Sequence, residues 1–178
     1  MKPRFLLLSM LCVAPGFANA ADFPILKPGL WEMRVTPSNP GPGAMQPHTT
    51  KMCIDPQAQK DMLQMGMGMM KSNCARHDMR MEGSKLLQSS ECKFGNSTMK
   101  SESVITFNGD SSGYHQEGKV TYDPPLMGKS QSSSTMDAKW LGPCGDAMKP
   151  GDIMLPDGRT VNMRAMTGAM GGAMGAPK

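Results

Sequence analysis

Residues 97–140, STMKSESVITFNGDSSGYHQEGKVTYDPPLMGKSQSSSTMDAKW, decide the fold of this chain. They contain three strand-like runs joined by turn sequences. The runs are 97–107, 113–122 and 128–140, and the turns are Asn108-Gly109-Asp110 and Asp123-Pro124-Pro125. Runs punctuated by Gly, Asn, Asp and Pro are typical of an antiparallel meander. Many of their positions are Ser, Thr, Lys or Gln, which indicates a sheet with one face in water.

A hairpin is predicted immediately before this meander. Residues 74–81 and 86–93 flank the tight turn Glu82-Gly83-Ser84-Lys85. Folding the chain about that turn places Cys74 opposite Cys92, where Cβ atoms of cross-strand neighbours lie about 4.5–5.5 Å apart. Small backbone adjustments bring such a pair to disulfide geometry.

Upstream of the hairpin, the pattern predicts two more strands and a helix. Trp31, Met33 and Val35 alternate with polar residues, so they predict a strand over 30–35 with those three side chains in a core. A loop over 37–47, rich in Pro and Gly, leads to a short strand over 48–54. Asp55-Pro56 is a helix start, and the helix is expected to reach about Lys71.

The fold class expected from these elements is mostly β (α+β). A curved antiparallel sheet of six or seven strands packs against one short helix in a single domain, residues 21–155. Residues 156–178 form a tail rich in Met, Gly and Ala. Because so little side chain there could be buried, we predict that the tail is disordered.

The N-terminus has the features of a cleavable export signal. Lys2 and Arg4 precede the apolar run 5–13, which is too short to span a bilayer because a spanning helix needs about 20 residues. Ala18-Asn19-Ala20 is an A-x-A site, so residues 1–20 are the predicted signal peptide, cleaved after Ala20, and the predicted location is the periplasm. Cys12 lies inside the apolar run, which argues against a lipid-modified cysteine at the mature N-terminus.

The net charge and the hydropathy of the sequence limit the classes of binding partner that we expect. Loss of Lys2 and Arg4 with the signal lowers the net charge from +4 to +2, too little to indicate nucleic acid or an anionic membrane as partner. No second segment approaches transmembrane length, so no membrane span is expected.

Four of the five cysteines remain after cleavage, and an even number in an exported protein predicts two disulfides. Of the three possible connectivities, the hairpin favours Cys74–Cys92, which leaves Cys53–Cys144. The alternative is a zinc site, but zinc sites usually contain close pairs of the C-x2-C kind, which this chain lacks.

Methionine is the unusual feature of the composition. Met1 and Met10 leave with the signal, so 19 of the 21 methionines remain. Five of them lie on the predicted helix: Met62, Met65, Met67, Met69 and Met70. Thioethers at M-x-M and M-x-x-M spacing select Cu(I), and methionine also serves as an oxidation sink. One alternative is core packing, since Met62, Met65 and Met69 form one helical stripe and methionine fills irregular gaps. Another is drift of a single lineage towards Met-Gly-Ala repeats.

Catalytic motifs are absent from the sequence. His48, His77 and His115 are expected at the surface, and no nucleophile elbow, H-E-x-x-H pair or phosphate-binding glycine loop is present. We therefore expect no enzyme and no cofactor, but a binding or envelope-maintenance module. Its expected partner is an envelope protein or a small apolar ligand held between helix and sheet, and copper at the five helix methionines is the alternative.

Several segments together resemble a known family. The chain is similar to the bacterial exported proteins catalogued as domain of unknown function 3617 in four segments. These are the opening Leu26-Lys27-Pro28-Gly29-Leu30-Trp31-Glu32, the Met52-Cys53-Ile54 before a helix, the cysteines at the hairpin and the closing Leu141-Gly142-x-Cys144. The resemblance covers roughly residues 26–146. It implies an envelope location and a compact β-rich domain, and it implies no activity. The Met-rich helix and tail depart from the family pattern.

Overall fold

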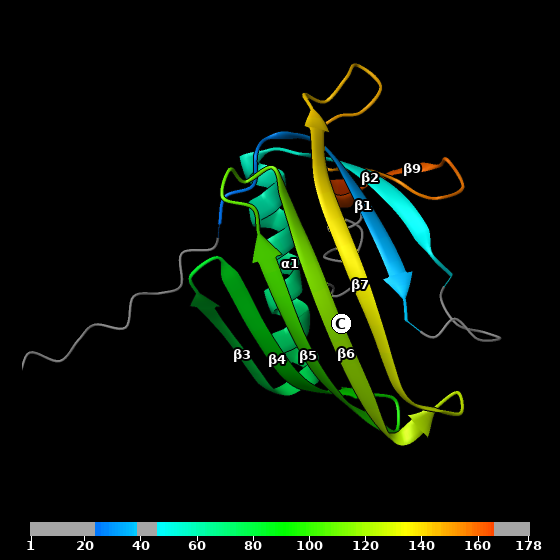
Figure 1. The fold of residues 1–178 in the computed structure, drawn as a ribbon. Coiled ribbons are helices and arrows are strands. Elements are labelled where there is room, and N and C mark those ends of the chain that lie inside the picture. Colours follow the sequence, from blue (N-terminus) through cyan, green and yellow to red (C-terminus); the bar gives the residue numbers. More distant parts are fainter. Residues whose placement is uncertain (1–23, 39–45, 166–178) are drawn as a thin grey trace, which may run out of the picture.

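The computed structural model describes residues 24–38 and 46–165. Within them, one nine-stranded antiparallel sheet is accompanied by the helix α1, Pro56–Asn73, which lies behind strands β4 to β6 in Figure 1. The spatial order of the strands is β3-β4-β5-β6-β7-β1-β2-β8-β9. Their bounds are β1 Gly29–Pro37, β2 His48–Ile54, β3 Cys74–Glu82, β4 Lys85–Phe94, β5 Ser97–Phe107, β6 Gly113–Leu126, β7 Lys129–Gly142, β8 Asp152–Met154 and β9 Thr160–Asn162.

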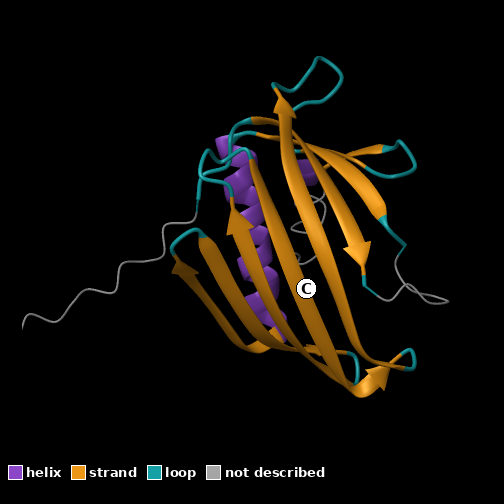
Figure 2. Ribbon diagram, viewed as in Figure 1, coloured by secondary structure: helices purple, strands orange, loops and turns teal. Residues whose placement is uncertain are grey.

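The meander over 97–140 is confirmed as β5, β6 and β7, drawn as long neighbouring arrows in Figure 2. The position of its second turn was wrong. Strand β6 continues through the two prolines to Leu126, which pairs with Lys129, so the turn consists of Met127 and Gly128. Both have positive φ, 49° and 77°, as a two-residue hairpin turn of type I′ requires. The prolines fall where the β6–β7 register is interrupted, between Thr121 and Leu126, so they displace few ladder hydrogen bonds.

The core centres on Trp31, which is fully buried. It clusters with Met52, Ile54 and Ala138 from the neighbouring strands, and its indole N–H donates to the carbonyl of Lys27 at 2.8 Å. The strand predicted over 30–35 therefore places Trp31 in a core, while Met33 packs against the cluster from a half-buried position. Gly29, with φ of 141°, passes so close to the carbonyl of Gly142 that a Cβ would collide with it.

The helix begins as the sequence indicates. The Asp55 carboxylate accepts from the Ala58 backbone N–H at 2.6 Å, and Pro56 occupies the first turn. The expected methionine stripe against the sheet is correct only for Met62, which packs on the Trp31 cluster. Met65 and Met69 are 37% and 62% exposed, so the C-terminal half of the helix contributes little to the core.

Two short strands extend the sheet beyond the expected six or seven. β8 pairs with β2, and β9 pairs with β8, so residues 160–162 of the predicted tail belong to the sheet. Three-residue strands are too short to show a periodicity. Long-range contacts hold this segment: Met163 is 3% exposed, and the Arg164 guanidinium lies 3.1 Å from both Asp55 and Asp61.

Other predictions for the chain ends concern undescribed residues. The signal peptide with its cleavage site after Ala20, and residues 166–178 of the predicted tail, lie outside the described residues. Among residues 24–38 and 46–165, no helix is long and apolar enough to cross a membrane.

The cysteines form Cys53–Cys144 and Cys74–Cys92, the same pairs that the hairpin register favoured. The first joins β2 to the segment after β7 across 91 residues, and the second joins β3 to β4 across 18. All four cysteines of the described residues are in disulfides, so none of these four supplies a thiolate for the alternative zinc site.

Removing the longer disulfide should destabilise the protein more than removing the shorter one. In the chain-entropy model, the Cys53→Ser/Cys144→Ser variant loses about 4.6 kcal/mol and the Cys74→Ser/Cys92→Ser variant about 3 kcal/mol, because the denatured chain gains more freedom from the longer loop. Urea denaturation of the two double variants measures the difference. A larger loss in the shorter pair would show that local hairpin structure, rather than loop closure, sets the contribution.

Candidate functional site

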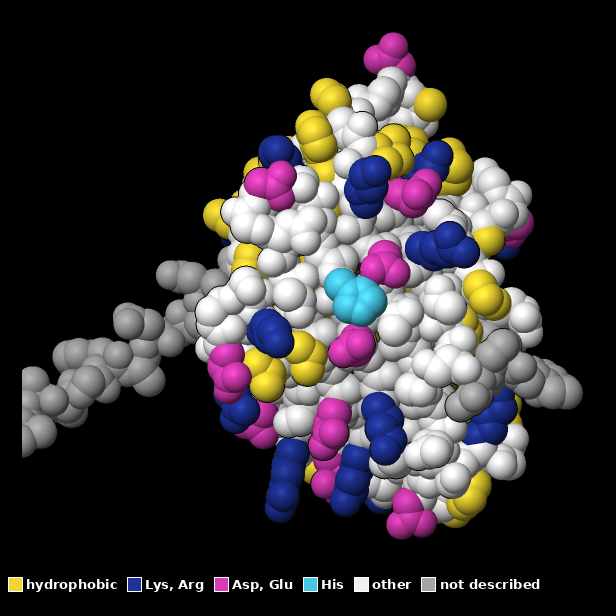
Figure 3. All heavy atoms as spheres, in the orientation of Figure 1, with side chains coloured by type: hydrophobic (Ala, Val, Ile, Leu, Met, Phe, Trp, Pro, Cys, Tyr) yellow, Lys and Arg dark blue, Asp and Glu magenta, His cyan; other side chains and the backbone are white. Residues whose placement is uncertain are grey.

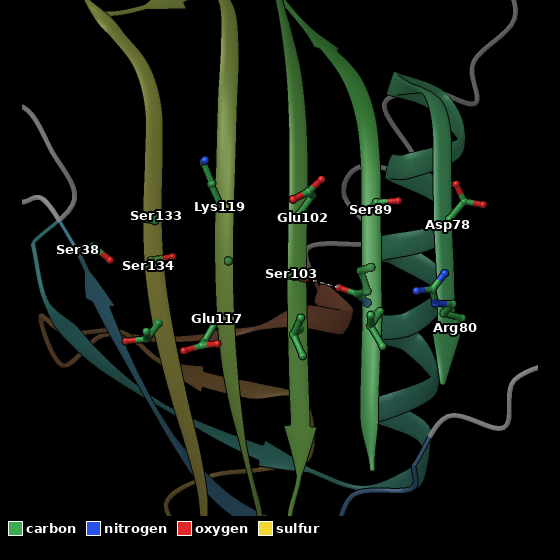
Figure 4. A pocket seen from close by; sticks show the side chains of 15 residues that line it. Ser38, Asp78, Arg80, Ser89, Glu102, Ser103, Glu117, Lys119, Ser133 and Ser134 are labelled. Atoms are coloured by element: carbon green, nitrogen blue, oxygen red, sulfur yellow. Dashed lines mark hydrogen bonds between the residues drawn. The ribbon is translucent and has the colours of Figure 1, made fainter. Parts of the chain in front are cut away.

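The face of the sheet that points away from α1 carries a groove of about 580 Å³ across strands β3 to β7. The strand register aligns one row of its lining side chains across five strands: Asp78, Ser89, Glu102, Lys119 and Ser133. Figure 4 shows this row with the residues labelled. The volume lies within the range of about 300–1,000 Å³ typical of small-molecule sites.

A second row, two residues along each strand, supplies the apolar part of the groove. Leu87 and Val104 lie side by side in this row, with Arg80 on one flank and Glu117 on the other. Both aliphatic side chains are half-buried, although they lie on the polar face of the sheet. The site therefore combines an apolar strip with charged groups at its sides, as binding pockets commonly do.

The register places an acidic and a basic side chain next to each other in the groove, but the two do not form an ion pair. Glu102 and Lys119 are directly opposite on β5 and β6, yet among the described residues neither forms an ion pair. In Figure 4 both side chains extend from adjacent strands on the same side of the sheet. Arg80, by contrast, is engaged by Glu82 at 2.9 Å. A carboxylate and an ammonium group are thus available to a ligand within one groove.

His115 lies beyond the groove on the same face. Its Nδ1 lies 2.6 Å from Asp137 Oδ1 across the β6–β7 pair, and its Nε2 lies 3.9 Å from Glu117. The side chain is 46% exposed, in agreement with the expected surface position. The hydrogen bond to Asp137 raises the pKa of His115 above its ordinary value, and the negative charges of Asp137 and Glu117 act in the same direction.

The five helix methionines do not converge on one site. Met62 packs on the core, whereas Met67 and Met70 line a hollow at the C-terminal end of α1 together with His77. From Met62 to Met70 the helix rises about 12 Å. One ion could not bind all five sulfurs while the helix is intact, so the structure does not bring the five predicted copper ligands together at one point.

Harder metal ligands do not cluster either. Within the ranges that the structure describes, no group of three or more His, Cys, Asp or Glu residues is placed to hold a metal ion.

Sequence reasoning missed the groove. It predicted a sheet with one face in water but singled out neither Glu102 nor Lys119, both of which are exposed. What it lacked was the strand register, because a shift of one residue would move either charge to the opposite face. The alternation of charged residues in 100–104 and 115–119 was the one available signal.

Substitution of Asp137 by Asn should lower the pKa of His115 towards about 6.5, its ordinary value, because the neutral amide no longer favours the imidazolium ion. NMR titration of the imidazole Cε1–H measures this. The contact of His115 with Asp137 makes its full contribution to the stability of the folded protein at pH values below the unfolded-state pKa of His115. That contribution is lost as the pH rises through the raised folded-state pKa. Glu117→Gln, at the longer distance, should have a smaller effect, and equal effects would contradict the dominant role of Asp137.

Comparison with known proteins gives one match. No curated protein and no solved structure matches the chain. A family model described as "Protein of unknown function (DUF3617)" matches residues 26–144, which run from the segment before β1 to the second cysteine of the longer disulfide. On that match, which covers most of the chain, the protein belongs to the DUF3617 family.

Proposed function

We propose that this chain is a non-enzymatic binding protein of the periplasm that holds a small zwitterionic ligand in the groove across β3 to β7. The observation that carries the proposal is the pair Glu102 and Lys119, which face one another in register and form no ion pair among the described residues. A ligand with an amine and an acid group would satisfy both charges. Its apolar part would cover Leu87 and Val104.

The proposed ligand site differs from the one expected from the sequence. A small apolar ligand between helix and sheet would need open space there, and Met62 occupies part of that interface by packing on the Trp31 cluster. The groove on the opposite face offers volume together with opposite charges. We therefore place the ligand on the charged face, which Figure 3 shows as a mixture of acidic and basic side chains.

Two features support the proposed periplasmic location. Two disulfides persist in oxidising compartments such as the periplasm. The N-terminal sequence, with basic residues, an apolar run and an A-x-A site, agrees with the same compartment. An envelope-maintenance role would follow if the bound molecule is a short peptide or a related wall fragment.

The dipeptide Ala-Leu is a suitable probe because it is a zwitterion with one apolar side chain. Titration of the folded, disulfide-bonded protein, followed by backbone amide NMR shifts, should perturb β4, β5 and β6. Lys119→Gln should weaken binding about three- to five-fold, as expected for loss of an exposed charge contact. Added salt should weaken it too.

Two controls make this test specific. Lys139→Gln removes an exposed lysine from the same face outside the groove, and it should leave binding unchanged. N-acetyl-Ala-Leu-amide, which has no charged ends, should not bind. If the capped dipeptide binds as well as Ala-Leu, or if both lysine variants lose the same affinity, recognition of a zwitterion in this groove is wrong.

A second candidate function, Cu(I) binding, is favoured by one specific observation. Met67, Met70 and His77 line the same hollow, which has a volume of about 620 Å³. Two thioethers and an imidazole form a soft ligand set suited to Cu(I). Met65, Met67 and Met69 are also exposed enough to react with oxidants, which keeps the oxidation-sink role as a variant of this candidate.

The copper candidate makes its own prediction. The Met67→Leu/Met70→Leu variant should lose the ability to compete with a Cu(I) chelator under reducing conditions that leave the disulfides intact. Met65→Leu/Met69→Leu is the matched control, since it removes as many thioethers from the same helix but outside the hollow. Equal loss in both variants would indicate nonspecific thioether binding along the helix.

A further inference from the structure

One end of the molecule exposes large apolar side chains that the fold does not use. Met127, in the β6–β7 turn, is 92% exposed, and Phe94, at the end of β4, is 60% exposed. Met69, in the last turns of α1, is 62% exposed. Figure 1 shows the β4–β5 turn, the β6–β7 turn and the C-terminal end of α1 at the same end of the sheet. We refer to Met69, Phe94 and Met127 as the apolar end.

The register independently places Phe94 and the β6–β7 turn towards the same end of the sheet. Phe94 pairs with Ser97, and the next residue of β5, Thr98, pairs with Asp123 of β6, four residues before Met127. The Cys74–Cys92 disulfide holds the segment that follows α1 against β4 at the same level. The positions of the two turns and the helix end are thus set by strand pairing and by a covalent bond.

Methionine is an unusual residue at the first position of the β6–β7 turn. Met127 has φ of 49° at the first position of a two-residue turn, where Asn, Asp or Gly is favoured. Its side chain packs on nothing that would offset this unfavourable backbone conformation, because it is almost fully exposed. An apolar side chain at this position gains from burial only if something covers it.

Basic residues surround the apolar end. Lys71 lies in the last turn of α1, Lys93 precedes Phe94, and Lys129 follows the β6–β7 turn. Arg76 and Lys100 both lie opposite Glu91, three residues before Phe94 on β4. Glu91 is 3.9 Å from Lys100, and another acidic residue, Asp123, lies four residues before Met127. The small net charge of the whole chain conceals this local excess of positive charge.

We propose that the apolar end docks on a membrane surface that contains anionic lipids. Phe94 and Met127 project from hairpin turns, and in that position they would enter the boundary between headgroups and acyl chains, while Lys71, Lys93 and Lys129 lie beside lipid phosphates. The positive charge around the apolar side chains selects a negatively charged surface over a second copy of this chain, whose matching end is equally basic. The docking does not involve the groove.

Cosedimentation of the mature, disulfide-bonded protein with vesicles tests the proposal. Vesicles of phosphatidylglycerol and phosphatidylethanolamine should bind it, whereas vesicles of pure phosphatidylcholine should bind it at least ten-fold less, and high salt should release it. Met127→Glu should lower binding to the anionic vesicles at least ten-fold. Ile25→Glu is the matched control, since Ile25 is 71% exposed. Ile25 precedes Leu26, whose backbone N–H donates to Gln59 near the N-terminal end of α1. Substitution of Ile25 should leave binding unchanged.

Further variants separate the alternatives. Lys93→Gln/Lys129→Gln should also weaken binding, and Lys119→Gln, in the groove, should not. Equal binding by Met127→Glu and Ile25→Glu, or no binding of the wild type to anionic vesicles, would overturn the proposal. So would a concentration-dependent dimer, seen by light scattering, that Met127→Glu disrupts, because the apolar end would then be an interface between copies of this chain.

Discussion

Burial of Trp31 is the interaction on which the rest of the structure depends. Its strand, β1, lies between β7 and β2, so the indole packs where the long meander meets the segment that leads to the helix. The ring is fully buried, and its N–H is satisfied by the Lys27 carbonyl. Because the chain has few aromatic residues, this one side chain supplies a large share of the apolar burial. The Cys53–Cys144 disulfide then ties β2 to the end of β7 on either side of it.

A core concentrated around Trp31 leaves much of the sheet with other roles. Helix α1 packs on the cluster through Met62, but its C-terminal half is exposed. The strands β3 to β5 extend away from the cluster, and the opposite face of the sheet is free to carry charge. The groove and the apolar end both occur in these regions, where side chains are not needed for packing. Function can vary there without loss of the fold, because the residues concerned contribute little to the core.

The two proposed surfaces use the same sheet in different ways. The groove depends on the face of the sheet, where cross-strand neighbours bring opposite charges side by side. The apolar end depends on the direction of the strands, since turns between antiparallel neighbours fall alternately at opposite ends. Because alternate turns share an end, Phe94 and Met127 lie on the same side of the molecule although they are far apart in sequence.

The sequence by itself determined the local features: the alternation around Trp31, the Asp55-Pro56 helix start, the hairpin that pairs Cys74 with Cys92, and the meander. Each follows from short-range periodicity or from backbone preferences of single residues. Tertiary structure alone decided that 152–154 and 160–162 join the sheet, that the helix methionines separate, and that Glu102 faces Lys119. These depend on register and on contacts between distant segments, and a change of one residue in register reverses the face that every side chain occupies.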